Sequence, residues 1–338
     1  MTSRRNPVAR RSSLAAGALV LTAVLGTVSC GGGKHASQST PQPPPPTSAA
    51  TSPTTAPTPT TNPLTGQGPS GGHVFAVKID NVGAARFQQQ GLNAADLVYV
   101  IQVEGGLSRY LAVYDSVHTD RSHVPARIGP VRSARQSDIP LLAAYGRVGL
   151  VYSGAISGLL KDLGRANLVN ITPDRAPGLF SNGGSSPTYI QSDQVFARFP
   201  QLAAVKDIGL RFGPLTAGGA AAHSVSVQYP SASFTFRASG AKWTVTMDGH
   251  DARASADNLI IQHVHVVQGK YTDHNAGHPD NEVFSVTTGQ GKADFYRDGK
   301  VWHGTWSKPT DTSPTTYAVN GRTFLLAPGR SWIVLDPR

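Results

Sequence analysis

The side chains best suited to chemistry in this sequence are three arginines close to glycine-rich turns. Arg109 follows Glu104-Gly105-Gly106, and Arg132 and Arg135 are three residues apart at the start of a predicted helix. The free backbone N–H groups and the dipole at a helix N-terminus attract anions. Guanidinium groups add paired hydrogen bonds to a carboxylate or phosphate. The pattern therefore predicts an anion-binding site at Arg109, Arg132 and Arg135.

The acids near these arginines leave two other interpretations open. Asp80, beside Asn81 at a predicted strand end, and Glu104 are each able to pair with an arginine, which would make the arginines a brace for the loop. Alternatively, Asp80 and Glu104 are the acid and base of a glycan or peptide hydrolase. Glycoside hydrolysis requires two carboxyl groups about 5–9.5 Å apart. We include Asp80, Asn81 and Glu104 among the candidate site residues and assign no catalytic residue.

Four histidines in the C-terminal part are weaker candidates for a metal site. His263 and His265 alternate along a predicted strand, and His274 and His278 follow within a few residues. Zinc requires three or four converging ligands. Ligation from a helix conflicts with the glycine before His278 and the proline after it. We predict an exposed polar strand face rather than a metal site, and no cofactor.

The N-terminus has the pattern of an export signal with a lipid-attachment cysteine. Four arginines precede the apolar stretch Leu14–Val28, which is short for a bilayer span. Cys30, the only cysteine, ends a run that looks like a bacterial lipobox. We predict a signal peptide at 1–30 and a lipid anchor on the extracytoplasmic face of the membrane, with secretion or an uncleaved anchor as alternatives. Arg10-Arg11 leaves the general and the twin-arginine export routes both open.

Residues 31–62 are predicted to form a disordered tether, because the segment is rich in Pro, Thr and Ser and has no large apolar side chains to bury. The formal charge of +10 falls to +6 once the four signal arginines are removed, and to about +5 for residues 63–338. Runs of Lys and Arg with interleaved aromatic residues are absent from the sequence. The sequence therefore argues against nucleic acid as a partner.

The remaining 276 residues are more than one core usually fills, so we predict two domains and an α+β fold. Residues 63–205 form a predicted mixed α/β domain. Its apolar runs alternate with predicted helices at Ser133–Tyr145 and Ile156–Leu163, and Gly105-Gly106 joins two strands in a hairpin.

Residues 220–338 form a predicted mostly β domain, either a sandwich or a barrel. Short apolar or alternating runs recur there, separated by turn residues. One of these runs is Leu259–Val267, which we predict to be a single strand. Asp298-Gly299 and Asn320-Gly321 are pairs favoured in two-residue β-hairpin turns.

Several of these segments also resemble the YerB-like family of lipoproteins from Gram-positive bacteria, which is defined by domains of unknown function. The most specific is Gly129–Arg135, with the sequence Gly-Pro-Val-Arg-Ser-Ala-Arg. Others are Pro63–Gly66, Val77–Asn81, Ala95–Tyr99, Val103–Gly106, Gly289–Lys292 and Ala327–Ile333. The resemblance implies two domains, the first mixed and the second mostly β, on a lipid anchor. It implies no reaction.

Two departures from the family pattern reduce the case for catalysis. The family often has an acid where this chain has Val100, and a histidine in the segment that reads Pro177–Phe180 here. We therefore favour a non-catalytic cell-envelope binding or interaction protein. Its expected partner is a cell-wall polymer or another envelope protein, and the hydrolase using Asp80 and Glu104 is the alternative.

Overall fold

The structure is a computed structural model that describes residues 61–69, 71–117, 126–182, 188–215, 217–273 and 280–337. The predicted signal peptide, Cys30 and nearly all of the tether lie outside the described residues, as do His274 and His278. Residues 56–338 form one compact unit, and the description below concerns that unit.

The first half of this unit alternates short strands with short helices. Its strands are β1 (Val74–Asp80), β2 (Leu97–Gln102), β3 (Ser108–Asp115), β4 (Arg127–Ile128), β5 (Val148–Val151), β6 (Leu168–Ile171), β7 (Phe180–Asn182) and β8 (Thr188–Gln191). Its helices are α1 (Asp138–Ala143), α2 (Ser157–Arg165) and α3 (Ser192–Arg198), with 3₁₀ turns η1 (Gly83–Phe87), η2 (Leu92–Ala94) and η3 (Glu104–Gly106). The Gly105-Gly106 turn joins β2 to β3 in the predicted hairpin, with both glycines at positive φ.

The second half consists of strands in the part of it that the structure describes. They are β9 (Ala220–Ala221), β10 (Ser224–Tyr229), β11 (Ala232–Ser239), β12 (Lys242–Met247), β13 (His250–Ala256), β14 (Asn258–His263), β15 (His265–Asp273), β16 (Asp280–Val286), β17 (Gly289–Arg297), β18 (Lys300–Lys308), β19 (Thr316–Val319), β20 (Arg322–Thr323) and β21 (Ser331–Asp336). The predicted hairpins at Asp298-Gly299 and Asn320-Gly321 are confirmed, and all four residues have the positive φ that this turn requires.

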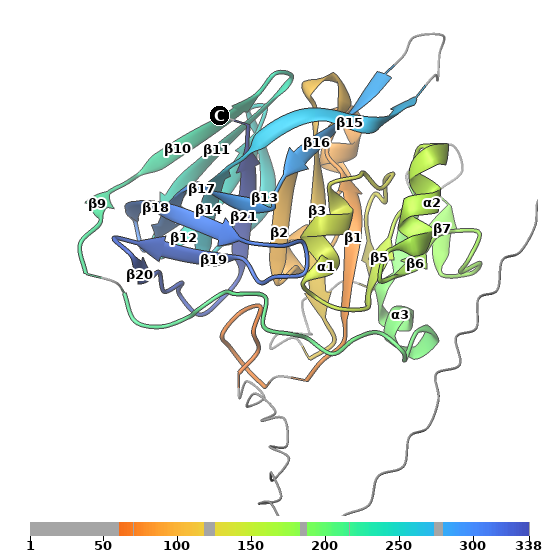
Figure 1. The fold of residues 1–338 in the computed structure, drawn as a ribbon, viewed down its shortest axis with the longest axis horizontal. Coiled ribbons are helices and arrows are strands. Elements are labelled where there is room, and N and C mark those ends of the chain that lie inside the picture. The colour runs from red at the N-terminus through yellow and green to blue at the C-terminus, as the bar shows by residue number, and fades with distance from the viewer. Residues whose placement is uncertain are drawn as a thin grey trace, which may run out of the picture. The chain divides into compact units, whose positions relative to one another are not determined.

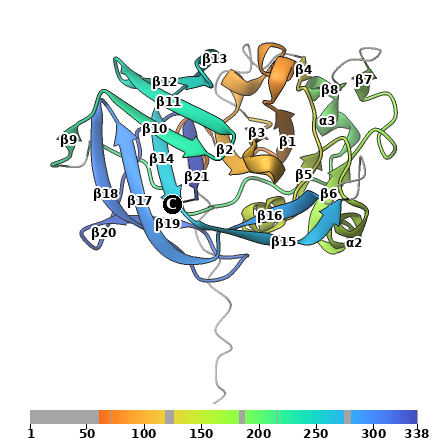
Figure 2. The same ribbon diagram turned by 90° about the horizontal axis from the view of Figure 1, so that it is seen from above.

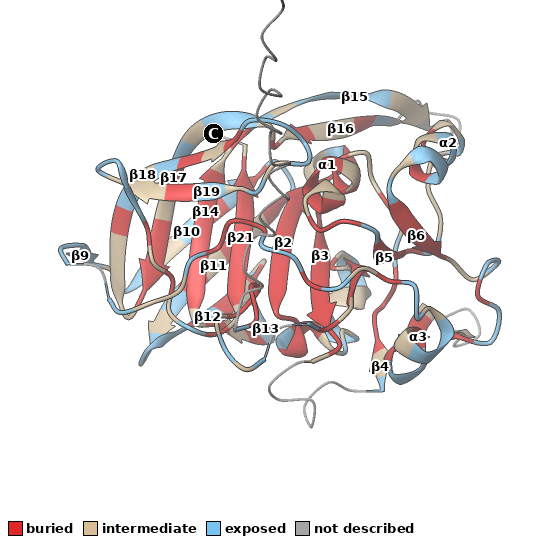
Figure 3. Cartoon of the chain, turned by 60° about the horizontal axis from the view of Figure 1, so that its bottom comes forward, coloured by how far each residue is buried: buried red, intermediate tan, exposed pale blue. Residues whose placement is uncertain are grey.

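One large sheet joins the two halves (Figure 1). Its strands follow the order β20-β19-β18-β17-β14-β21-β2-β3-β1-β5-β6. The last strand, β21, lies between β14 and β2 and runs parallel to both. Figure 3 shows the buried strands β14, β21, β2 and β3 next to one another. The C-terminal strand thus completes the sheet that the N-terminal strands begin.

Each face of this sheet is covered by a different layer. The four-stranded sheet β10-β11-β12-β13 packs against one face, where Phe234 and Phe236 contact Tyr110 of β3 and Trp332 of β21. On the other face, α1 and α2 bury leucines against strands such as β5. Apolar side chains from both halves of the sequence therefore share each core.

The mostly β character is observed, but the second half is not a self-contained sandwich or barrel. Its strand β21 pairs with β2 of the first half, and its four-stranded layer covers strands of both. The reason lies in β21, whose residues are all buried. This is typical of a central strand with parallel neighbours, whereas a strand at the surface exposes one face to solvent. The predicted strand Leu259–Val267 was also wrong, since it is divided at Val264 between β14 and β15.

The β15–β16 hairpin leaves the large sheet and runs across toward α2 (Figure 2). Several hydrogen bonds hold it there, and three of them show how. Tyr271 donates to Asp162 of α2, Lys270 N–H donates to the Gln136 side chain at 2.9 Å, and Ser285 N–H donates to Ser137 Oγ at 2.9 Å. The hairpin therefore brings residues of the second half over the loop that carries the predicted site.

Candidate functional site

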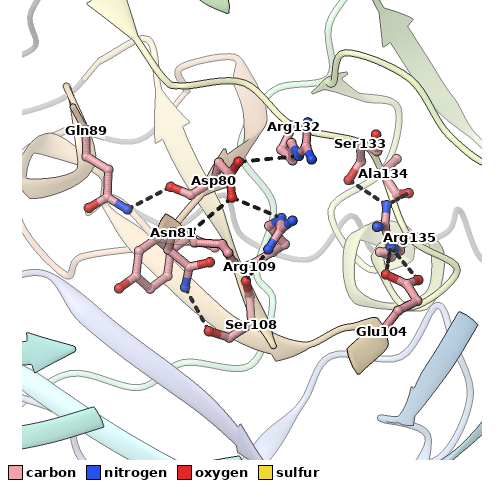
Figure 4. A network of polar contacts seen from close by, with 12 residues as sticks. Asp80, Asn81, Gln89, Glu104, Ser108, Arg109, Arg132, Ser133, Ala134 and Arg135 are labelled. Atoms are coloured by element: carbon pink, nitrogen blue, oxygen red, sulfur yellow. Dashed lines mark hydrogen bonds and ion pairs between the residues drawn. The ribbon is translucent and has the colours of Figure 1, made fainter. Parts of the chain in front are cut away.

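Asp80 lies between two of the predicted site arginines. It ends β1 directly opposite Arg109 of β3, and its Oδ1 is 3.3 Å from Arg109 Nε. Its Oδ2 is 3.3 Å from Arg132 Nε (Figure 4). The Arg109 side chain is buried, whereas that of Arg132 is 53% exposed. Two guanidinium groups thus share one carboxylate, and the outward-facing one is Arg132.

Backbone hydrogen bonds place Arg132 beside this carboxylate. The Gly129–Arg135 stretch runs alongside the end of β1, where Asp80 N–H donates to Pro130 O at 2.8 Å and Arg132 N–H donates to Lys78 O at 2.9 Å. On the other side, Ser153 N–H donates to Arg132 O. The most specific segment of the sequence is therefore fixed between β1 and the end of β5, so that Arg132 is held in register with Asp80.

Arg135 forms a second ion pair, with Glu104. Arg135 Nε is 2.6 and 2.8 Å from the two Glu104 oxygens, and its Nη1 donates to the carbonyl oxygens of Ser133 and Ala134 (Figure 4). Both side chains are largely buried. These contacts fix the guanidinium plane and leave Arg135 little freedom to reach a ligand.

The predicted helix begins later than expected, and carboxylates of the protein already occupy its N-terminus. Helix α1 begins at Asp138 rather than at Ser133, and the Arg135 N–H donates to Asp138 Oδ2 at 2.7 Å. The next N–H, that of Gln136, donates to Glu282 Oε1 at 2.6 Å. The protein's own carboxylates therefore accept the backbone hydrogen bonds that the sequence assigned to an external anion.

Glu282 is the residue of this network that the sequence interpretation missed. The chain contains two glutamates, and both of them, Glu104 and Glu282, interact with Arg135. Glu282 is fully buried, and burial raises its pKa to about 7, with a further increase from the Glu104 charge. The rarity of glutamate was a signal available in the sequence. However, no local sequence pattern connects residue 282 with residue 135.

The raised pKa of Glu282 predicts a pH-dependent stability. The folded chain binds this proton more tightly than the unfolded chain, whose carboxyl has the ordinary pKa of 4.5. The free energy of unfolding therefore falls as the pH rises from about 4.5 through 7. We expect Glu282→Gln to flatten this dependence, measured as urea midpoints between pH 4.5 and 8. Asp193→Asn, at an exposed position on α3, is the control and is expected to keep the wild-type slope, and an unchanged slope in Glu282→Gln would contradict the prediction.

A fully buried ion pair lies beneath the arginines. Lys78 Nζ of β1 is 2.8 Å from Asp138 Oδ1, and both side chains have no exposed surface. Burial lowers the pKa of Lys78, while the Asp138 charge opposes this shift. The pair ties the central strand to the start of α1, so it supports the loop between them.

The predicted site residues thus fall into two ion-paired groups. Asp80, Arg109 and Arg132 form one, and Glu104 and Arg135 form the other, while Asn81 Nδ2 donates to Ser108 Oγ at 2.9 Å. Arg109 feels the charges of Glu104 and Arg135, so the groups are neighbours. Asp80 and Glu104 face arginines rather than each other, so this geometry does not favour the hydrolase.

The histidine candidates do not come together as a metal site in the described residues. His263 donates from Nδ1 to Asp336 at 3.0 Å and contacts Asp294 through Nε2 at 3.4 Å. These two carboxylates raise the pKa of His263 to about 9, so both ring nitrogens carry protons at neutral pH. His265 belongs to β15, a different sheet, which corrects the expectation of a shared strand face. Within the described residues there is no cluster of three His, Cys, Asp or Glu able to hold a metal ion.

The fold and this network define a mostly β protein made of two sequence segments that complete one sheet. The chain belongs to the family described as "Protein of unknown function (DUF3048)", whose N-terminal domain matches residues 60–206 and whose C-terminal domain matches residues 221–333. The resemblance stated from the sequence is thereby confirmed.

Comparisons of sequence and of structure both find YerB of Bacillus subtilis to be similar to this chain. The chain is 35% identical over 97 residues to the Bacillus subtilis (strain 168) protein named "Putative lipoprotein YerB", a match that spans 28% of this chain and 27% of that protein. The crystal structure of the YerB protein from Bacillus subtilis matches with a TM-score of 0.65 over 82% of this chain and 97% of that chain, at 21% identity. That structural likeness supports the fold. In the described part of this chain, no helix combines the length and the apolar character needed to span a membrane.

Proposed function

We propose that this chain is a lipid-anchored protein of the extracytoplasmic membrane face that binds an anionic ligand at Arg132 without chemically altering it. The anchor is supported by the basic and apolar segment before Cys30 and by the name of the Bacillus subtilis relative. Mass spectrometry of the native chain tests it. A chain with an intact leader, or with an unmodified Cys30 thiol, would refute the anchor.

The observation that carries the binding proposal is the unequal charge around Asp80. Arg109 and Arg132 together bring two positive charges to one carboxylate, and Arg132 is the exposed partner. Within the described part of the chain, Asp80 is the only ionic contact of Arg132. Its Nε faces Asp80, so the Nη edge is the part that remains for a phosphate or carboxylate group of an anionic cell-wall polymer.

The surrounding contacts make this arginine a better binding group than an ordinary surface arginine. Asp80 and the backbone bonds of the Gly129–Arg135 stretch restrict the Arg132 side chain before a ligand arrives. A restricted side chain loses less conformational entropy on binding. The carboxylates in the network accept hydrogen bonds from arginines and backbone amides, which suits a structural role more than proton transfer.

We expect Arg132→Ala to weaken the binding of inorganic phosphate by about tenfold or more, because one charge-assisted hydrogen bond contributes about 1.5–3 kcal/mol. Isothermal titration calorimetry and the phosphate-induced rise in melting temperature measure the effect. Arg165→Ala is the matched control, since Arg165 is 81% exposed and pairs only weakly with Asp162 at 4.0 Å. Equal phosphate binding in wild type and Arg132→Ala would refute the site.

A further inference from the structure

An open cavity of about 750 Å³ lies where the two halves of the sequence meet, at the sheet edge formed by the ends of β2 and β21. Its walls come from the β15–β16 hairpin, the end of β10, the end of β2 and Pro337, which follows β21. In Figure 2 the hairpin starts close to the C-terminal end of the chain, which is consistent with these walls. The volume is in the range of small-ligand sites.

Carboxamide side chains dominate the polar part of this cavity. They are Gln102 of β2, Gln228 of β10, Gln268 of β15 and Asn281 of β16, each from a different strand. A carboxamide has two donors and an acceptor with two lone pairs, so it matches groups that both donate and accept, such as hydroxyls and amides. Four of them around one space specify a ligand rich in such groups.

Two of the lining residues have buried oxygens that lack a partner among the described residues. Gln102 is 9% exposed, and its Oε1 has no hydrogen-bond donor. Glu282 uses Oε1 to accept from Gln136, while its Oε2 has no donor. A buried polar atom without a partner costs free energy. A ligand that donates to the Gln102 carboxamide would recover part of that cost.

The charge of the cavity argues against an anionic ligand. None of its described lining residues is Lys, Arg or His, and its one ionisable acid is Glu282. A phosphate or carboxylate would meet a carboxyl group there and no cation. The cavity therefore differs in chemistry from Arg132, where positive charge exceeds negative.

The lining also favours a sugar over a peptide strand. Peptides that extend a sheet require a row of backbone N–H and C=O groups. Here two of the lining residues, Pro230 and Pro337, have no N–H, and four others carry carboxamide side chains. The prolines and valines of the wall supply apolar surface for the C–H faces of pyranose rings.

We propose that this cavity binds a neutral, hydroxyl-rich ligand, an oligosaccharide without acidic groups, through the carboxamides of Gln102, Gln228, Gln268 and Asn281. The full chain is titrated with the N-acetylglucosamine tetramer and with cellotetraose, and binding is followed by calorimetry and by chemical-shift changes. We expect saturable binding of at least one of these neutral sugars. Phosphate is expected not to displace it, because phosphate binds at Arg132.

Gln102→Leu removes the buried carboxamide with little change in volume, and we expect it to weaken sugar binding about tenfold. Gln228→Ala combined with Gln268→Ala tests the same site at two exposed positions, so it remains informative if Gln102→Leu impairs folding. Gln201→Ala, an exposed residue that does not line the cavity, is the control. Sugar binding that is unchanged in both cavity variants would overturn the proposal. The proposal would also be overturned if neither sugar bound, or if a neutral Ser/Thr/Gly hexapeptide bound in place of the sugars.

Discussion

Deleting residues 331–338 is expected to unfold both halves of the protein, although the deletion removes only one strand. Strand β21 separates β14 from β2, and the side chains of Trp332, Ile333, Val334 and Leu335 are fully or almost fully buried. Burying one such side chain contributes about 1.5–3 kcal/mol, so the four together contribute roughly 6–12 kcal/mol. That is comparable to the whole stability of a typical domain, about 5–15 kcal/mol.

Circular dichroism during thermal unfolding and the dispersion of the amide NMR spectrum measure this effect. A chain that ends at Asp336 is the control, because it retains all of β21. We expect it to unfold cooperatively near the wild-type temperature, while the chain that ends at Arg330 shows no cooperative transition. A retained cooperative transition for residues 63–205 in the shorter chain would show that the first half folds independently.

The second large effect is expected for Lys78→Met. The substitution preserves the long side chain but leaves the Asp138 carboxylate buried without its ammonium partner. Removing one member of a buried ion pair typically costs about 3–5 kcal/mol, because the remaining charge is uncompensated. Asp138 Oδ2 also accepts the Arg135 N–H, so the start of α1 loosens as well. Urea unfolding gives the loss in free energy.

Lys242→Met is the matched control for this variant. Lys242 is 2.6 Å from Asp257, a similar distance, but its side chain is 46% exposed. Exposed pairs contribute about 0–1 kcal/mol, so we expect a small change. The double variant Lys78→Met with Asp138→Leu is expected to regain part of the lost stability, because no unpaired charge remains. If the free energy of unfolding of Lys78→Met lies within about 1 kcal/mol of the wild-type value, the pair does not support the loop as described.

Features that depend on a few adjacent residues were predictable. The Gly105-Gly106, Asp298-Gly299 and Asn320-Gly321 turns were predicted from residue type, since only residues that tolerate positive φ form them. The mostly β character of the second half also follows from its short apolar runs and turn residues. Local conformational preference is a property of the residues themselves.

The candidate site was predictable only in part. The arginines and acids were identified by type, and the strand register explains why Asp80 meets Arg109. The sequence offered pairing of these arginines with Asp80 and Glu104 as an alternative, and the structure shows such pairs. The sequence did not decide which arginine pairs with which acid, or that Glu282 reaches the Gln136 N–H from 146 residues away in sequence. Long-range pairing leaves no periodic signal in a single sequence, so the role of Glu282 appears only in the fold.

The sequence by itself determined the turns, the family, and the types of side chain that surround the Gly129–Arg135 stretch, because these follow from local preference and residue identity. The tertiary structure alone decided that β21 joins the two halves and that Glu282 takes the place predicted for an external anion. It also brought four carboxamides from four strands around one cavity. The physical reason is that burial and strand pairing depend on which distant segments approach each other, and that choice is made by the whole chain when its apolar surfaces are buried together.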